Sequence, residues 1–163
     1  MDTKNKIVKT AKVCHIIAKV LYIAAFAVCL AFIALAIALP LTNAIDTLTN
    51  AETAVLFATL ALYAFICIGL LWNVEGIFKC LVKDGSPFSE GVCHYLKKIA
   101  IFVLVLSVVP AIVGTTLIRI ICPATEITFP IEVSGIIVGV VLFVIGVIFN
   151  YGKELQKRDD ETL

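Results

Sequence analysis

Four long apolar runs, separated by polar segments, set the pattern of this chain. They cover residues 20–39, 54–72, 99–118 and 131–149, and the first three contain no charged side chain. A helix needs about 20 residues to cross a hydrocarbon core of about 30 Å, and each run has that length. The runs are rich in Val and Ile, but within lipid only a helix satisfies its own backbone hydrogen bonds. The pattern predicts an all-α integral membrane protein, a four-transmembrane-helix bundle forming one domain of residues 1–163.

The polar segments beside the runs also have helical spacing, so we expect the helices to continue beyond the membrane. Residues 7–17 alternate apolar side chains with lysines, and residues 151–158 continue the fourth run. The elbow, residues 84–89, interrupts this pattern with the helix-breaking sequence Asp-Gly-Ser-Pro. The expected caps are Ser89, with Phe88 as a hydrophobic staple, for the third helix, and Thr49 with Glu52 for the second.

The basic residues predict an orientation in the membrane. Of the 13 Lys and Arg residues, all but Arg119 lie on one side of the predicted spans. Arg119 is at a helix end, from which its long side chain can reach water. Because an excess of Lys and Arg marks cytoplasmic loops, we expect both termini and the elbow to lie in the cytoplasm. The simplest location is a bacterial plasma membrane, crossed several times.

Composition agrees with the membrane class and excludes a soluble domain. The chain is 61% hydrophobic and 15% charged, whereas soluble domains are about half apolar and about a quarter charged. The mean hydropathy of +1.09 points the same way.

Small residues recur at helical spacing and predict the faces through which the helices pack, because they let backbones approach closely in lipid. The expected seams are Ala24, Ala27, Ala31 and Ala34 in the first run; Ala100, Ser107, Ala111 and Gly114 in the third; and Gly135, Gly139 and Gly146 in the fourth. A second hypothesis assigns the glycine stripe of the fourth run to a homodimer contact, since it contains a Gly-xxx-Gly pair.

The spans offer little chemistry. Glu132 is the one residue with a charged side chain within the four runs, and it lies at the edge of the last. Proton and ion pathways use such residues deep in a span, so the sequence argues against a small proton-coupled exporter. The Ser and Thr side chains are expected to bond back to their own helices, and Pro110 to kink the third. No nucleophile motif, phosphate-binding loop or carboxylate pair appears, so we expect neither an enzyme nor a cofactor.

Six cysteines raise the question of a metal site. The dipeptides Cys14-His15 and Cys93-His94 both lie near the expected cytoplasmic face, and two Cys with two His could complete a tetrahedral zinc site. Their spacing matches no zinc motif, and adjacent side chains on a helix point about 100° apart. The sequence therefore predicts no metal and leaves these four residues as secondary candidates.

Two stretches resemble a known family. They are Asp84-Gly85-Ser86-Pro87-Phe88-Ser89-Glu90 with Leu96-Lys97-Lys98-Ile99, and the tail, residues 151–163, which begins Tyr-Gly-Lys-Glu-Leu-Gln. Both are similar to small bacterial four-helix membrane proteins catalogued as domain of unknown function twenty-nine seventy-five. In that family a Gly-x-Pro-Phe turn opens the third helix. Val92, Ala100 and Asp159 depart from its usual residues. The resemblance implies that this chain is the membrane-bound partner of a small helix-turn-helix regulator of the Cro/repressor type.

Three functional hypotheses follow. The first is a membrane-embedded interaction protein that sequesters such a regulator, with no direct contact to nucleic acid. Its expected partner-binding residues are Gly85, Pro87, Phe88, Glu90, Glu154, Asp159, Asp160 and Glu161. The second is an oligomeric channel, holin or transporter-like protein. The third is an immunity or membrane-stress protein, whose outer loop near Ile127 and Phe129 is apolar enough to meet a peptide.

Overall fold

The computed structural model describes residues 2–42, 49–84 and 89–161, and within them the chain is helical apart from short connections. The helices are α1 (Asp2–Thr42), α2 (Asn50–Asp84), α3 (Glu90–Ile121) and α4 (Val133–Glu161). All four are long and apolar enough to cross a membrane. This confirms the predicted all-α four-helix class and indicates a multi-pass membrane protein. Each helix also extends beyond its apolar run, as the polar segments predicted.

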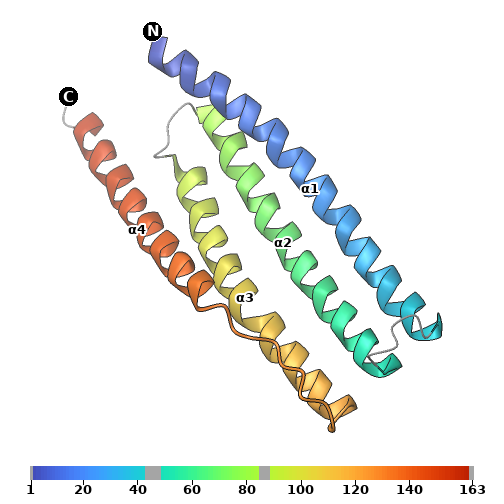
Figure 1. Ribbon diagram of the computed structural model, residues 1–163. Coiled ribbons are helices and arrows are strands. Elements are labelled where there is room, and N and C mark those ends of the chain that lie inside the picture. The colour runs from blue at the N-terminus through green and yellow to red at the C-terminus, as the bar shows by residue number, and fades with distance from the viewer. Residues whose placement is uncertain (1, 43–48, 85–88, 162–163) are drawn as a thin grey trace.

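The four helices lie side by side in chain order, so the bundle is open (Figure 1). Within the described residues α2 contacts α1 and α3, α4 contacts α3, and no other pair of helices meets. Successive helices run in opposite directions, which brings the start of α1, the end of α4 and the two described flanks of the elbow, Asp84 and Ser89, to one end of the molecule (Figure 1). We call this the basic end, because it holds every described Lys and Arg except Arg119.

Local capping follows the sequence. Ser89 has extended backbone angles and its side chain accepts a hydrogen bond from the Val92 backbone N–H at 3.4 Å, which confirms it as the cap of α3. At the start of α2, the Thr49 backbone N–H donates to the Glu52 carboxylate at 2.7 Å, and the Glu52 N–H donates to Thr49 Oγ1 at 3.3 Å. This reciprocal pair is the expected capping box.

The alanine seam predicted for the first run is wrong as an internal seam. Ala24, Ala27, Ala31 and Ala34 are all exposed in the structure. α1 instead meets α2 through a line that includes Ala18, Cys29 and Phe32, with Cys29 Sγ lying 3.7 Å from the Ala61 carbonyl oxygen. Both lines have the same helical spacing, so periodicity alone does not choose between them. Ring contacts identify the buried line, since Phe32 and Phe57 lie 6.4 Å apart between centroids.

The seams of α3 and α4 are confirmed as internal. Ala100, Ser107, Ala111 and Gly114 are buried in α3. A Cβ added to Gly139 would lie 2.7 Å from Leu104 Cγ, and one added to Gly146 would lie 3.1 Å from Lys97 Cγ. The glycine stripe of α4 is therefore covered by α3. The hypothesis that this stripe forms a homodimer contact is wrong, because the same chain already fills it.

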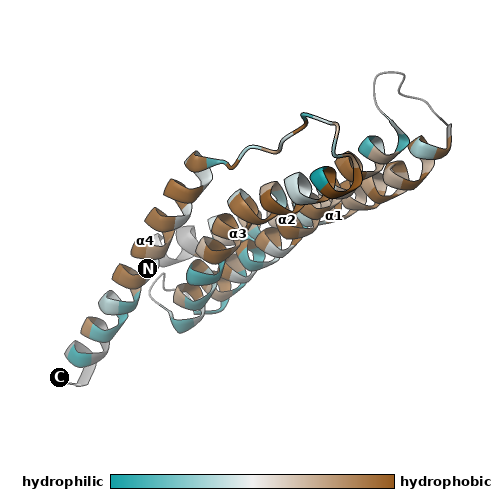
Figure 2. Ribbon diagram, turned by 90° about the horizontal axis from the view of Figure 1, so that it is seen from below, coloured by the Kyte–Doolittle hydropathy of each residue, from teal (hydrophilic) through white to brown (hydrophobic). Residues whose placement is uncertain are grey.

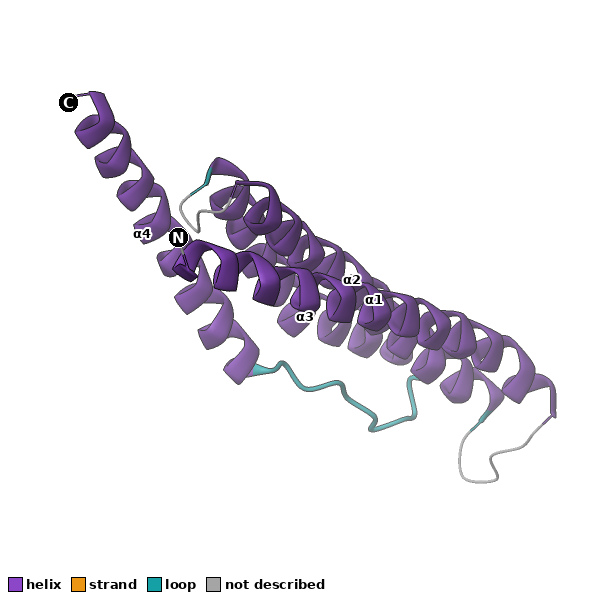
Figure 3. Cartoon of the chain, turned by 90° about the horizontal axis from the view of Figure 1, so that it is seen from above, coloured by secondary structure: helices purple, strands orange, loops and turns teal. Residues whose placement is uncertain are grey.

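The fourth helix begins beside the middle of α3 and not beside its end. Gly135 lies against Ser107, and the Glu132 backbone N–H donates to the Ser107 carbonyl at 3.3 Å. The connection between α3 and α4 therefore returns along α3 as a non-helical chain, which we call the return segment (residues 122–132; Figures 1 and 3). It runs beside residues 108–121, a helical length of about 21 Å at 1.5 Å per residue. α4 then leans away from the other three helices (Figure 2).

Candidate functional site

The basic end gathers most of the described polar side chains. All four helices reach it, and the polar colouring of α4 is concentrated towards its C-terminus (Figure 2). The basic residues there whose side chains the structure describes are Lys9, Lys12, Lys19, Lys79, Lys83, Lys97, Lys98, Lys153 and Arg158. A candidate surface for a water-soluble partner is therefore found at this end.

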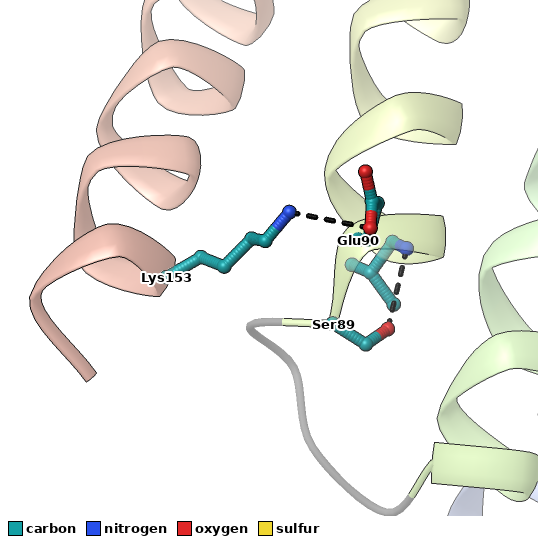
Figure 4. Close-up of polar contacts among 4 residues, drawn as sticks. Ser89, Glu90 and Lys153 are labelled. Carbon is teal, nitrogen blue, oxygen red and sulfur yellow. Dashed lines mark hydrogen bonds and ion pairs between the residues drawn. The ribbon is translucent and has the colours of Figure 1, made fainter. Parts of the chain in front are cut away.

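An ion pair joins the two segments that the sequence analysis selected for partner binding. Lys153 Nζ of α4 lies 3.4 Å from Glu90 Oε2 in the first turn of α3, one residue after Ser89 (Figure 4). The Glu90 side chain is 86% exposed, so a pair of this kind contributes about 0–1 kcal/mol to stability. The pair is informative because it shows that the end of the elbow and the start of the tail are neighbours in space, although they are far apart in the sequence.
 

A hollow of about 600 Å³ opens beside this ion pair. Its lining includes Cys80 of α2, Glu90, Cys93 and His94 of α3, and Asn150 of α4. Burial raises the pKa of the Cys80 thiol above its ordinary value. The hollow is a shape feature of the basic end that the sequence did not reveal, because it depends on how far α4 is displaced along α3.

The structure describes the remaining predicted partner residues to different extents. Glu154 is exposed on α4, next to Lys153. Asp159, Asp160 and Glu161 lie in the last turns of α4, and their side chains are outside the described part of the structure. Gly85, Pro87 and Phe88 also lie outside the described residues.

The two Cys-His dipeptides are not brought together. Cys14 and His15 belong to α1 and Cys93 and His94 to α3, and α2 separates these helices. His15 Nδ1 is instead 3.9 Å from Glu75 Oε1 of α2, while the His94 ring packs edge-on against Tyr95. Among the described residues no group of three or more His, Cys, Asp or Glu is placed to hold a metal ion. The four-residue zinc arrangement considered from the sequence is therefore wrong.

The return segment lies at the end of the molecule opposite the basic end. Hydrogen bonds to its backbone hold it against α3. Thr59 and Ser107 bond to the carbonyls of Val55 and Val103 in their own helices, as expected. Thr115 does not: its hydroxyl accepts from the Phe129 N–H at 3.1 Å and donates to the Phe129 carbonyl at 3.4 Å. Non-helical backbone at membrane depth needs such partners. Thr115 thus has a role that the sequence analysis missed.

Half-buried and exposed side chains alternate along the return segment, so one side of it faces the protein. Thr125, Ile127 and Phe129 are half-buried, whereas Glu126 and Thr128 are exposed. The Phe129 ring fills the space beside Gly114, where an added Cβ would lie 2.7 Å from the ring. Of the two large side chains behind the immunity hypothesis, the Phe129 ring lies against Gly114 of α3 and Ile127 is half-buried, so this surface exposes less apolar area than the sequence suggested.

A carboxylate fastens the return segment to α2. The Thr125 hydroxyl donates to Glu52, and this bond, followed by those from Thr49, lowers the pKa of the Glu52 carboxyl. A lowered pKa means that the contact favours the folded state above the ordinary pKa of a glutamate, about 4.3, and is lost as the pH falls through the lowered value. The fastening is therefore complete at neutral pH.

Comparison of this chain with protein-family models, with curated proteins and with solved structures finds no match in any of the three.

Proposed function

We propose that this protein is a membrane-embedded interaction protein whose basic end holds a small helix-turn-helix regulator at the cytoplasmic face. The observation that carries the proposal is the ion pair between Lys153 and Glu90, at 3.4 Å. In the sequence the elbow and the tail are two separate polar segments. The ion pair supports a single docking surface to which both contribute.

Charge within the tail, and not that of the basic end as a whole, supports a regulator as the partner, because the four acids of the tail outnumber its three basic residues. Acidic side chains at this surface include Glu90 and Glu154, and the last turns of α4 add Asp159, Asp160 and Glu161. A DNA-binding regulator is basic on the face that contacts phosphates, and its binding to DNA is largely electrostatic. Acidic side chains that pair with that face would compete with DNA for it. The helix-turn-helix identity rests on the family resemblance of the elbow and tail.

The distribution of Lys and Arg supports the orientation. All basic residues except Arg119 belong to segments at the end that carries the termini and the elbow. A bias of this size in short loops favours the cytoplasmic side. The docking surface is then presented to soluble regulators.

The test has two stages in cells that produce the full-length protein. Cross-linking and affinity purification in detergent first identify which DNA-binding protein co-purifies. Retention of that protein on membranes is then measured at two salt concentrations for the triple variant Asp159→Asn, Asp160→Asn, Glu161→Gln and for Glu90→Gln. Glu126→Gln, an exposed acid at the opposite end, is the matched control.

We expect both surface variants to lose retention and to show a weaker salt dependence, while Glu126→Gln behaves as the unchanged protein. Retention and salt dependence that are equal in all four proteins would overturn the proposal. The proposal would also be overturned if no DNA-binding protein co-purified.

One observation favours a second candidate, an oligomeric channel or transporter-like protein. Glu132, expected at the edge of a span, lies level with Ser107 in the middle of the third apolar run. Carboxylates at such depth mark proton and ion pathways. The candidate requires proton or cation flux in liposomes that contain the protein, and loss of that flux in Glu132→Gln. Liposomes that stay tight would exclude it.

A further inference from the structure

A groove between α2 and α3 lies where their apolar runs meet the basic end. It has a volume of about 430 Å³. Its lining runs from Ile68, Ile101 and Phe102, within the apolar runs, to Trp72, Asn73, Tyr95 and Lys98 at the boundary of those runs. The groove is therefore apolar at one end and polar at the other, along the direction in which a lipid molecule lies.

Close packing fixes the walls of this groove. A Cβ on Gly69 would overlap the Phe102 ring, and one on Gly76 would lie 2.6 Å from the Tyr95 ring, so only glycine admits these two aromatic side chains. Asn73 is buried, and its Nδ2 donates to the Gly69 carbonyl at 2.6 Å.

Trp72 is held from the other side. Its ring meets that of Tyr22 of α1 edge to face, with the centroids 5.7 Å apart and the planes at 72°. The Trp72 side chain remains 59% exposed. Packing with Tyr22 therefore sets its position without covering it, and one face of the groove is preformed.

The polar end of the groove suits a negatively charged headgroup. Lys98 is exposed and has no carboxylate partner among the residues that the structure describes. Tyr and Trp each carry a hydrogen-bond donor and favour the membrane–water interface, and Trp72 and Tyr95 lie at the boundary of the apolar runs. The groove contains no Asp or Glu among its lining residues.

A neighbouring hollow shows the contrast. It has a volume of about 500 Å³ between α1 and α2 and shares Trp72 and Tyr95 with the groove, but Glu75 lies beside its lysines, Lys19 and Lys79. The acid there offsets part of the positive charge. The two linings then carry the same net charge of +1, but only the α2–α3 groove has no carboxylate that would repel an anion.

We propose that the α2–α3 groove binds one anionic glycerophospholipid. Its phosphate lies at Lys98, beside Trp72 and Tyr95, and an acyl chain follows Ile101 and Phe102 towards the membrane centre. Basic pockets between transmembrane helices bind anionic headgroups in this way. The proposal is independent of the regulator-binding function, since it concerns the lateral surface of α2 and α3 and not the elbow or the tail.

Trp72 makes the site directly observable, because it is the single tryptophan of the chain. The full-length protein is reconstituted in phosphatidylcholine vesicles that contain increasing amounts of either brominated phosphatidylglycerol or brominated phosphatidylcholine. Bromine quenches tryptophan fluorescence at contact, so the two curves give the relative affinity of the two lipids at Trp72. Lys98→Gln, Lys98→Arg and Lys83→Gln are compared with the unchanged protein. Lys83 is exposed and does not line the groove.

We expect phosphatidylglycerol to be preferred about fivefold, the factor that corresponds to about 1 kcal/mol per lysine near an anionic surface. Lys98→Gln should abolish the preference, whereas Lys98→Arg and Lys83→Gln should retain it. Equal quenching by both lipids in the unchanged protein would overturn the proposal, as would a preference that survives Lys98→Gln. Relief of the quenching by millimolar inorganic phosphate would also overturn it, because the groove would then bind a free phosphate and not a lipid.

Discussion

Individual small residues set the distances between these helices, and their neighbours determine which small residues matter. Ala111 of α3 is 1% exposed, whereas Ala31 of α1, which has an equally apolar sequence around it, is exposed. Alanines lie on two opposite faces of α1, so alanine spacing does not identify its buried face. Aromatic and sulfur contacts to α2 do so.

The same substitution should destabilise the protein at Ala111 and leave its stability nearly unchanged at Ala31. Ala111→Leu inserts three carbons into a filled space and should destabilise the detergent-solubilised protein by about 1–3 kcal/mol. Ala31→Leu adds the same atoms to an exposed surface and should leave stability nearly unchanged. Thermal or denaturant unfolding of both variants measures the difference. A large loss at Ala31 would mean that the exposed face of α1 packs against protein, for example a second copy of the chain.

Element boundaries follow from the sequence because they depend on local chemistry. The caps at Ser89 and Thr49 are formed by side chains within three residues of the groups they satisfy. The seam of α4 was also predictable, since three glycines on one face admit a neighbouring helix whichever helix it is. The identity of that neighbour and the register between α3 and α4 were not predictable, because they depend on contacts between distant segments.

The return segment shows a signal that could have been recognised. Thr125, Ile127 and Phe129 alternate with Glu126 and Thr128, a period of two that is typical of an extended chain with one buried side. Hydropathy averaged over a window hides this alternation. The hydroxyl of Thr115, which hydrogen-bonds to the Phe129 backbone, is the second part of the signal.

The register of α4 can be tested by a designed disulfide. A Cβ added at Gly135 would lie 3.2 Å from Ser107 Cβ, close to the separation of about 3.5–4.5 Å found in disulfides. In a background without the six native cysteines, Ser107→Cys with Gly135→Cys should oxidise readily in membranes. Loss of free thiols, counted by mass spectrometry after denaturation, measures the reaction.

A control pair distinguishes the two possible registers. Ile118→Cys with Gly135→Cys lies about three helical turns away along α3, on the same face of the helix as Ser107, and should stay reduced. If α4 instead began beside the end of α3, the control pair would oxidise and the first pair would not. That result would remove Glu132 from the middle of the third apolar run and, with it, the support for a transport function.

At the scale of the whole molecule, an open row of helices leaves wide apolar faces. Large exposed hydrophobic side chains occur along the apolar stretches of all four helices, including Ile23, Phe65, Ile112 and Val140. Exposing such surfaces to water is unfavourable for a monomer, whereas lipid tails cover them without cost. The same openness places the grooves between helices within reach of lipids and leaves the polar ends as the surfaces for soluble partners.

The orientation of the row can be tested with a native cysteine at each end. Cys122 lies at the start of the return segment and Cys14 at the basic end, and both are partly exposed. If the lysine-rich end is cytoplasmic, a membrane-impermeant maleimide added to intact bacterial cells should label Cys122 and leave Cys14 unreacted. Permeabilised cells should allow reaction at Cys14 as well.

Two variants assign the label. Cys122→Ser should remove the signal from intact cells, and Cys14→Ser should leave it unchanged. Labelling of Cys14 in intact cells, with Cys122 reached only after permeabilisation, would reverse the orientation. The acidic tail and the elbow would then face away from the cytoplasm, where no DNA-binding regulator could reach them, and the proposed function would fail together with the topology.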